Sequence, residues 1–290
     1  MYTIKQASAR TGVSVPLLRA WQRRYGIVDP ERSRAGYRLY SEDDLARIRA
    51  MRALVRQGWS PSAAAASLEG AASETAASPA SSPHPDAIVA RFTQAAAAMN
   101  GEEVERLLDE ISSLGSFETV AETYLLPAMV SVGEAWERGS LDVAAEHAAS
   151  HAVLRRLSAA FEAAGLPAPG AGGVLVGLPP GARHELGALA FSVAARRAGL
   201  PVTYLGADLP APDWVEAASR SAAISAVIAV PTESDRGAAT AVAEALRSSH
   251  PGLLLAAGGR GASAGLGPDV AVLPDSLSGA TDALRRAIGR

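Results

Sequence analysis

The chain has 290 residues, of which 48% are hydrophobic and 20% are charged, so it is long enough for two or three domains. It contains no cysteine, which excludes disulfides, thiolate metal sites, thiol catalysis and a thioether-linked chromophore. The first 70 residues carry 12 Lys and Arg against 6 Asp and Glu, and the other 220 carry 15 against 24. A basic head on an acidic remainder predicts a polyanionic partner at one end only. No apolar run approaches the roughly 20 residues of a membrane span and no signal-peptide pattern is present, so we expect a cytoplasmic protein without a membrane partner.

Residues 1–70 have the pattern of a winged helix-turn-helix domain. A short helix is followed by a turn at Gly12, and a second helix opens with Ser14 as its cap and Pro16 near its first turn. The segment RSRAGYRLY predicts a β-wing, and a third helix starts after Ser41 with acidic residues in its first turn. Arginine holds phosphate and reads guanine, so the second helix and the wing provide the candidate DNA-binding residues. These candidates are Arg19, Arg23, Arg24, Tyr37 and Arg38.

The segments YTIKQASARTGVSVPLLRAWQRRYG and GYRLYSEDDLARI resemble the winged-helix DNA-binding domain of the MerR family. The resemblance implies a recognition helix in the major groove of a double-stranded DNA operator, bound by a dimer or a higher assembly. The alternative is a basic three-helix module for protein contact. Leu17 and Trp21 could equally anchor the second helix in the core, Tyr40 is ambiguous, and residues 45–57 mostly predict a solvated arginine face.

Two regions follow before the last domain. Residues 71–86, AASETAASPASSPHPD, have too little apolar bulk to bury and predict a flexible linker. Residues 87–165 show apolar residues at helix spacing, with turns around Gly101, Gly115 and Gly139, and predict a four-helix bundle. We expect Pro127 to kink the third helix or to mark its restart.

Residues 172–290 alternate short apolar runs with Ala-rich stretches of helix length. Five such runs predict an α/β flavodoxin-like domain with a doubly wound parallel sheet. Ligands of this fold bind at the carboxyl ends of the strands, so the loop PPGARHELG after the first strand is the expected site. On this loop, His184 is a good axial ligand for a transition metal. Gly187, Gly258 and Gly259 would let a bulky ligand approach the backbone.

In the helical region, Trp136 precedes Glu146 and His147 with nine residues between the tryptophan and the glutamate. An indole, a carboxylate and an imidazole could therefore line one cavity. Taken alone, the simpler interpretation places Trp136 in the bundle core and pairs Glu146 with Arg155 or Arg156. His147 and His151, four residues apart, could also hold a metal from one helical face, although a pair without a third ligand is more often structural.

The motifs HELG at 184–187, Gly258–Gly259 and the W, nine, EH spacing together resemble the cobalamin-binding module of methionine synthase, corrinoid methyltransferases and B12-dependent photoreceptors. The last motif is similar to light-sensing MerR regulators of the CarH and LitR type. The resemblance implies that Trp136, Glu146 and His147 cap the adenosyl group of adenosylcobalamin and that His184 binds cobalt from below. The nucleotide tail would then extend toward Gly258 and Gly259.

The chain departs from this pattern at three places. Ala182 stands where the family has a carboxylate two residues before the histidine, which leaves the orientation of His184 open. Val230, Pro231 and Thr232 replace the usual Ser-x-Leu at the end of the third strand, and Glu137 replaces a histidine after the cap tryptophan.

These features predict a light-responsive, cobalamin-dependent transcriptional repressor that is a light-dependent homo-oligomer, dimer or tetramer, and not an enzyme. Light acting on the cobalt–carbon bond would change the assembly and therefore the number of heads that engage DNA together. One alternative is a corrinoid methyl carrier. Another is a regulator whose pocket takes biliverdin or another tetrapyrrole without a covalent link, or takes no cofactor.

Overall fold

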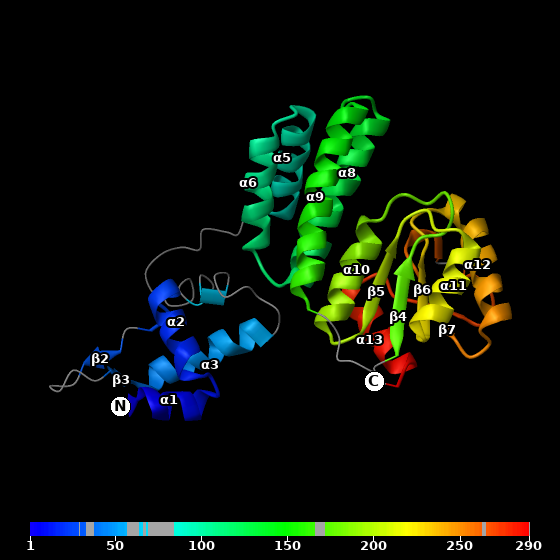
Figure 1. Ribbon diagram of the computed structural model, residues 1–290. Coiled ribbons are helices and arrows are strands. Elements are labelled where there is room, and N and C mark those ends of the chain that lie inside the picture. The colour runs from blue at the N-terminus through cyan, green and yellow to red at the C-terminus, as the bar shows by residue number, and fades with distance from the viewer. Residues whose placement is uncertain are drawn as a thin grey trace. The chain divides into compact units, whose positions relative to one another are not determined.

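The structure, a computed structural model, describes residues 1–28, 30–32, 38–56, 64–65, 68, 84–165, 172–262 and 265–289 (Figure 1). The chain divides into two compact units, one comprising Met1–Ile88 with Arg106–Val120 and the other Val89–Glu105 with Ala121–Arg290. Most of the predicted linker lies outside the described residues. Its last two residues differ from the prediction because helix α5 already begins at Pro85, and proline is favoured in the first turn of a helix.

The described part of the N-terminal head contains helices α1, α2 and α3 and a small antiparallel sheet of order β1-β3-β2. Its elements are β1 (Tyr2–Thr3), α1 (Ile4–Thr11), α2 (Val15–Tyr25), β2 (Glu31–Arg32), β3 (Arg38–Tyr40) and α3 (Glu42–Arg56). The predicted turn is formed by Gly12, which has a φ of 66° and ends α1 in the left-handed conformation. Ser41 and Asp44 exchange reciprocal bonds of 2.8 and 3.0 Å between backbone N–H and side chain, which is the predicted start of α3.

The head is held together by an apolar core between the helices and β3. Its fully or almost fully buried members include Ala7, Leu18, Trp21, Ile27, Tyr40, Leu45, Ile48 and Met51. The paired strands β2 and β3 form the base of the predicted wing, and the tip at residues 33–37 lies outside the described part of the chain.

The helical region consists of longer helices joined by short turns. Its elements are α5 (Pro85–Ala97), α6 (Gly101–Ser112), α7 (Phe117–Val120), the π-helix η1 (Ala121–Leu125), α8 (Leu126–Glu137) and α9 (Val143–Ala163). Gly115 lies between α6 and α7, and Gly139, with a φ of 70°, lies between α8 and α9. Pro127 lies in the first turn of α8, so the expected kink or restart at this proline falls next to the boundary between the π-helix and α8.

The C-terminal domain is a five-stranded parallel sheet of order β5-β4-β6-β7-β8 with helices on both faces. The strands are β4 (Gly173–Gly177), β5 (Val202–Gly206), β6 (Ala223–Ala229), β7 (Leu254–Gly258) and β8 (Val270–Val272), and the helices are α10 (Leu186–Arg197), α11 (Ala211–Ser221), α12 (Arg236–Ser249) and α13 (Leu277–Ala287). Helices α10 and α13 lie on one face and α11 and α12 on the other (Figure 1). This order confirms the flavodoxin-like prediction, and it puts the topological switch point at the carboxyl end of β4.

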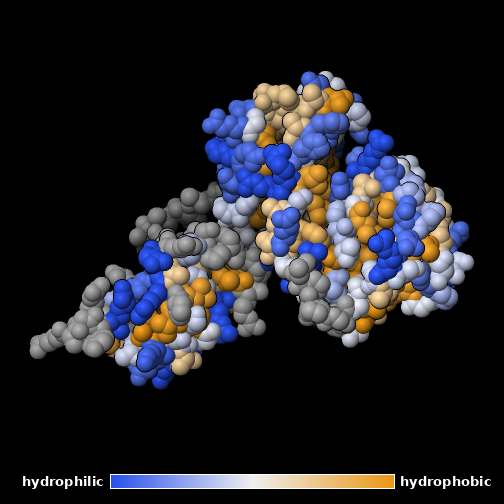
Figure 2. All heavy atoms as spheres, in the orientation of Figure 1, coloured by the Kyte–Doolittle hydropathy of each residue, from blue (hydrophilic) through white to orange (hydrophobic). Residues whose placement is uncertain are grey.

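The face of the sheet under α11 and α12 carries a continuous apolar core. Buried members include Leu175, Trp214, Ile228, Val230, Val242, Leu246 and Leu255. Figure 2 shows apolar side chains on the surface of the second unit, interspersed with polar ones. Within the described ranges, no helix has both the length and the apolar character needed to cross a membrane.

Arg196 and Glu122 each make a contact that joins the helical region to the α/β domain within the second unit. The Arg196 guanidinium on α10 donates to the carbonyl oxygen of Phe161 at 3.2 Å, near the end of α9, and to that of Val202 at 2.9 Å. At the other contact, a carboxylate oxygen of Glu122 in η1 accepts from the backbone N–H of Leu277, the first residue of α13. A carboxylate at a helix N-terminus satisfies an orphan N–H and complements the helix dipole.

Candidate functional site

The loop between β4 and α10 carries the predicted metal ligand at the carboxyl edge of the sheet. His184 is exposed on this loop, and no hydrogen bond or ion pair to its ring is found in the described part of the chain. Ala182, by contrast, is 1% exposed and offers no polar side chain. A Cβ on Gly187, in the first turn of α10, would meet no atom within 4 Å. An exposed imidazole on a loop with open space at Gly187 is of a kind that could bind the cobalt of a corrinoid.

Gly258 and Gly259, at the end of β7 and just after it, were predicted to let a ligand approach the backbone. Gly259 has a φ of 99°, and a Cβ on it would lie 2.6 Å from the carbonyl oxygen of Val230. The close approach expected from glycine is therefore made by the loop after β6, and approach of a ligand at Gly258 and Gly259 stays a prediction. Sequence reasoning missed Gly261, where a Cβ would lie 2.0 Å from the carbonyl oxygen of Thr232. The run GGRG was the available signal, since only a residue without a side chain fits there.

The residues predicted to cap the adenosyl group lie where α8 meets α9. Trp136 is 48% exposed at the end of α8, so the alternative that it fills the bundle core is wrong. Glu146 and His147 are in the first turns of α9, where a carboxylate oxygen of Glu146 lies 2.6 Å from Nδ1 of His147. Ser150 donates to the other carboxylate oxygen at 2.5 Å. The carboxylate and the imidazole thus form one polar unit.

The alternative pairing of Glu146 with Arg155 or Arg156 is also wrong. Both arginines bind Glu105 of α6 instead, at 2.6 and 2.8 Å. These two hydrogen bonds, that of Arg156 first, hold the pKa of Glu105 below its usual value. The carboxylate of Glu146 is left to His147 and Ser150.

The structure brings together some predicted residues and not others. The rings of His147 and His151 are 6.4 Å apart and tilted by 51°. Among the residues that the structure describes, no three His, Asp or Glu side chains gather as a metal-ion site. No hydrogen bond, ion pair or ring contact joins His184 to Trp136, Glu146 or His147.

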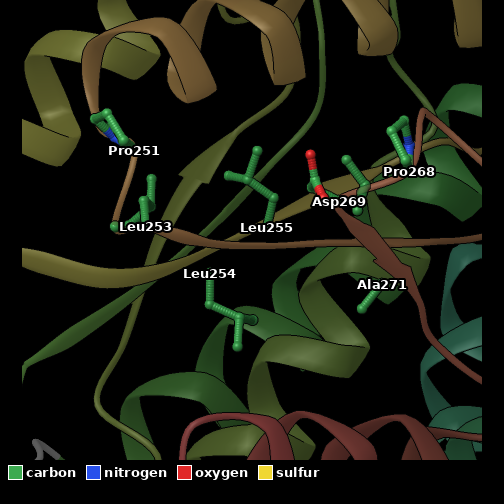
Figure 3. A pocket seen from close by; sticks show the side chains of 9 residues that line it. Pro251, Leu253, Leu254, Leu255, Pro268, Asp269 and Ala271 are labelled. Carbon is green, nitrogen blue, oxygen red and sulfur yellow. The ribbon is translucent and has the colours of Figure 1, made fainter.

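Two shallow hollows are present elsewhere on the second unit. One of about 480 Å³ follows η1 and α8, lined by Glu122, Leu126, Pro127, Val130, Ser131 and Glu134. The other, of about 410 Å³, lies at the amino ends of β7 and β8, opposite to the edge that bears His184. Figure 3 shows its lining, in which Leu255 and Asp269 point to one side of the strands and Leu254 and Ala271 to the other. Because ligands of doubly wound sheets bind at the carboxyl edge, this second hollow is not the candidate site.

In the head, the DNA-binding candidates whose side chains the structure describes are exposed and are not part of the core. Arg19 and Arg23 are exposed on α2, and Arg38 is exposed on β3. The side chain of Arg24 and the whole of Tyr37 lie outside the described residues.

The structure assigns to the core or to the surface the three residues of the head whose location the sequence did not decide. Trp21 is 3% exposed and Tyr40 is fully buried, so both are core residues, whereas Leu17 is 42% exposed on α2. The expectation of a solvated arginine face on α3 is only partly met. Arg47 donates to the carbonyl oxygen of Ile27 at 2.9 Å and Arg52 to that of Thr11 at 2.8 Å, so these two side chains fix the helices of the head.

Comparison with known proteins agrees with this division. Residues 2–71 match the family model of the MerR HTH family regulatory protein, and residues 88–160 match the model of the B12 binding domain. The fold and the site thus define a MerR-type DNA-binding protein joined to a cobalamin-binding region.

The relatives narrow this class. The chain is 37% identical over 223 residues to the HTH-type transcriptional repressor CarH of Myxococcus xanthus, which covers 73% of each chain. It is 34% identical over 210 residues to the HTH-type transcriptional repressor CarA of the same organism, covering 72% of this chain and 69% of CarA. The chain therefore belongs to the family of CarH and CarA.

Among solved structures, the monomethylamine corrinoid protein of Methanosarcina barkeri matches with a TM-score of 0.56 and 15% identity, covering 69% of this chain and 99% of that one. At this level of identity the likeness concerns the fold alone.

Proposed function

We propose that this protein is a cobalamin-dependent, light-responsive transcriptional repressor. The observation that carries the proposal is the exposed imidazole of His184 at the switch point of a flavodoxin-like sheet, in a chain whose head exposes Arg19 and Arg23 on its second helix. Its relatives CarH and CarA are named as transcriptional repressors. In this proposal the predicted boundaries at 1–70, 87–165 and 172–290 separate the DNA-binding head, the helical cap and the cobalamin domain.

Different residues of this chain would contact different parts of the ligand. His184 would bind cobalt from below, Gly187 would let the ligand approach the backbone, and the nucleotide tail would extend toward Gly258 and Gly259. When bound, adenosylcobalamin supplies a cobalt–carbon bond that light can break. The exposed indole of Trp136 would present an apolar face to the adenosyl base, while the paired Glu146 and His147 would present hydrogen-bonding groups.

The cap residues give the chain a way to respond to its ligand. They lie at one end of α8 and α9, and a cap that loses the adenosyl group loses the contacts that favour one arrangement of these helices. We propose that the chain forms a homo-oligomer whose assembly depends on this arrangement. Affinity for an operator would then change, because it depends on how many heads bind the same DNA.

The test is reconstitution of the purified protein in the dark with adenosylcobalamin, methylcobalamin, heme or biliverdin, each in a separate sample. We expect adenosylcobalamin to bind. Green illumination of the complex should then change its absorption spectrum, its oligomeric state and its affinity for DNA, where the DNA is a sequence selected from a random pool. His184→Ala should alter the cobalt spectrum. Identical values in darkness and after illumination would refute the light response, and preferential uptake of biliverdin or heme would refute the choice of cofactor.

A further inference from the structure

The turn after β5 is built to hold the loop that carries His184. Gly206 and Asp208 both have positive φ, 86° and 55°, which turns the chain back toward the end of β4. The N–H of Leu178 donates to the carbonyl oxygen of Gly206 at 3.0 Å, and that of Asp208 donates to Ala182 at 3.0 Å. The carboxylate of Asp208 in turn accepts from the N–H of Gly181 at 2.7 Å. One aspartate therefore binds two successive residues of the loop.

The other end of the loop is held from β5 itself. The hydroxyl of Tyr204 donates to a carboxylate oxygen of Glu185 at 2.7 Å, and Glu185 is the residue that follows His184. Burial first, and then the hydrogen bond to Glu185, raise the pKa of Tyr204 well above its usual value. A tyrosine phenol is protonated at neutral pH in any case, so this hydroxyl is able to donate.

A β-bulge brings both groups to this edge. The register of β4 and β5 shifts between Val176 and Gly177, so that Val176 pairs with Tyr204 while Gly177 pairs with Gly206. The extra residue, Leu205, separates the tyrosine from the turn that contains Asp208. Bulges commonly re-aim side chains next to functional sites. Here the bulge lets one strand contact the loop on both sides of His184.

In the described part of the chain, no hydrogen bond fixes the ring of His184, so its orientation depends on the loop that carries it. Ala182 is buried and carries no group that could hydrogen-bond the ring of His184. A metal-binding imidazole keeps its orientation through groups that surround it, and changes in those groups typically weaken metal binding by about 10- to 100-fold. In this chain hydrogen bonds hold residues on either side of His184 and not the imidazole ring itself.

We infer that Asp208 and Tyr204 are positioning residues for His184, which they hold at the cobalt-binding edge through Gly181, Ala182 and Glu185. The inference rests on the proposed function. It assigns to β5 and its turn the task of presenting the lower ligand.

Four variants separate the contributions. Asp208→Gly keeps the left-handed backbone and removes the acceptor, whereas Asp208→Asn keeps both the acceptor and a side chain that tolerates positive φ. Tyr204→Phe removes only the hydroxyl and keeps the ring, which packs edge-on at 6.2 Å from Phe161. Asp282→Asn, an exposed position on α13, is the matched control.

Three readouts are taken on the full chain: amide hydrogen exchange of residues 178–185 without ligand, the affinity for hydroxocobalamin, and the absorption spectrum at saturation. For Asp208→Gly and Tyr204→Phe we expect faster exchange in the loop and binding weakened by at least about 10-fold. Their spectra should shift toward that of His184→Ala. Asp208→Asn and Asp282→Asn should stay close to the wild type in all three.

The outcomes distinguish the two proposals. Wild-type protein that binds no hydroxocobalamin would overturn the proposed function. Wild-type binding together with unchanged exchange, affinity and spectrum in Asp208→Gly and Tyr204→Phe would overturn the positioning role alone.

Discussion

The guanidinium carbon of Arg196 lies 3.5 Å from the centroid of the Phe161 ring, which joins α10 to the last turn of α9. The same guanidinium donates to two backbone carbonyl oxygens, those of Phe161 and Val202. Helix α9 has 21 residues, and Glu146 lies about 22 Å along it from Phe161. One arginine thus fastens the helix far from its proposed cap residues.

Replacing this arginine by lysine tests the joint. Arg196→Lys keeps the charge but loses the planar fork that reaches both carbonyl oxygens, so we expect the free energy of unfolding to fall by about 1–2 kcal/mol. Urea denaturation of the ligand-free protein measures the change. Arg220→Lys, at an exposed position of α11, should leave the midpoint where it is. Equal midpoints for both variants would show that the joint contributes little.

The glycines at the end of β7 and in the loop after it should differ sharply in their tolerance of a side chain. Gly259→Ala and Gly261→Ala place a Cβ 2.6 and 2.0 Å from carbonyl oxygens, so each should lower the free energy of unfolding by at least about 2 kcal/mol. Gly258→Ala meets nothing closer than 3.8 Å and should change it by less than about 1 kcal/mol. Thermal and urea unfolding give the ranking, and a Gly258 variant as unstable as the other two would contradict this account of the loop.

Trp136 should matter for the ligand and not for folding. Because its side chain is 48% exposed, Trp136→Ala should change the free energy of unfolding by less than about 1 kcal/mol. It should weaken binding of adenosylcobalamin while leaving hydroxocobalamin, which lacks the adenosyl group, unaffected. Equilibrium dialysis in the dark measures both affinities. Val143→Ala, 53% exposed at the start of α9, is the control, and equal losses for the two cobalamins would remove Trp136 from the cap.

Arg19 and Arg23 should account for part of the salt dependence of DNA binding. Each arginine that neutralises a phosphate contributes about one unit to the slope of log affinity against log salt. We expect Arg19→Ala and Arg23→Ala to weaken binding and to reduce this slope, by about one where the contact is to phosphate. Fluorescence anisotropy across a salt series tests this, with Arg220→Ala as the control. Unchanged slopes and affinities in both variants would place the DNA-binding surface elsewhere.

The sequence predicted the elements well because their signals are local. The five apolar runs became β4 to β8, and the helix expected after Ser41 begins there, with reciprocal bonds between Ser41 and Asp44. Each of these features depends on residues only a few positions apart, so periodicity and caps are enough to predict them.

The parts that could not be predicted depend on tertiary packing. Glu105, and not Glu146, binds Arg155 and Arg156, because the choice of partner depends on which helices lie side by side. The bond from Tyr204 to Glu185 likewise depends on the bulge that shifts the register of β5. Among the candidate residues, the sequence indicated His184 and the cap, but not the groups that hold the loop.

The π-helix Ala121–Leu125 determines the direction in which the side chain of Glu122 points relative to those of α8. Each residue of an α-helix advances the side chain by about 100°, so loss of one residue from this segment would rotate Glu122 away from the first N–H of α13. Insertion or deletion of one residue here would therefore break the contact between Glu122 and Leu277, while Arg196 and Phe161 would still join α10 to α9.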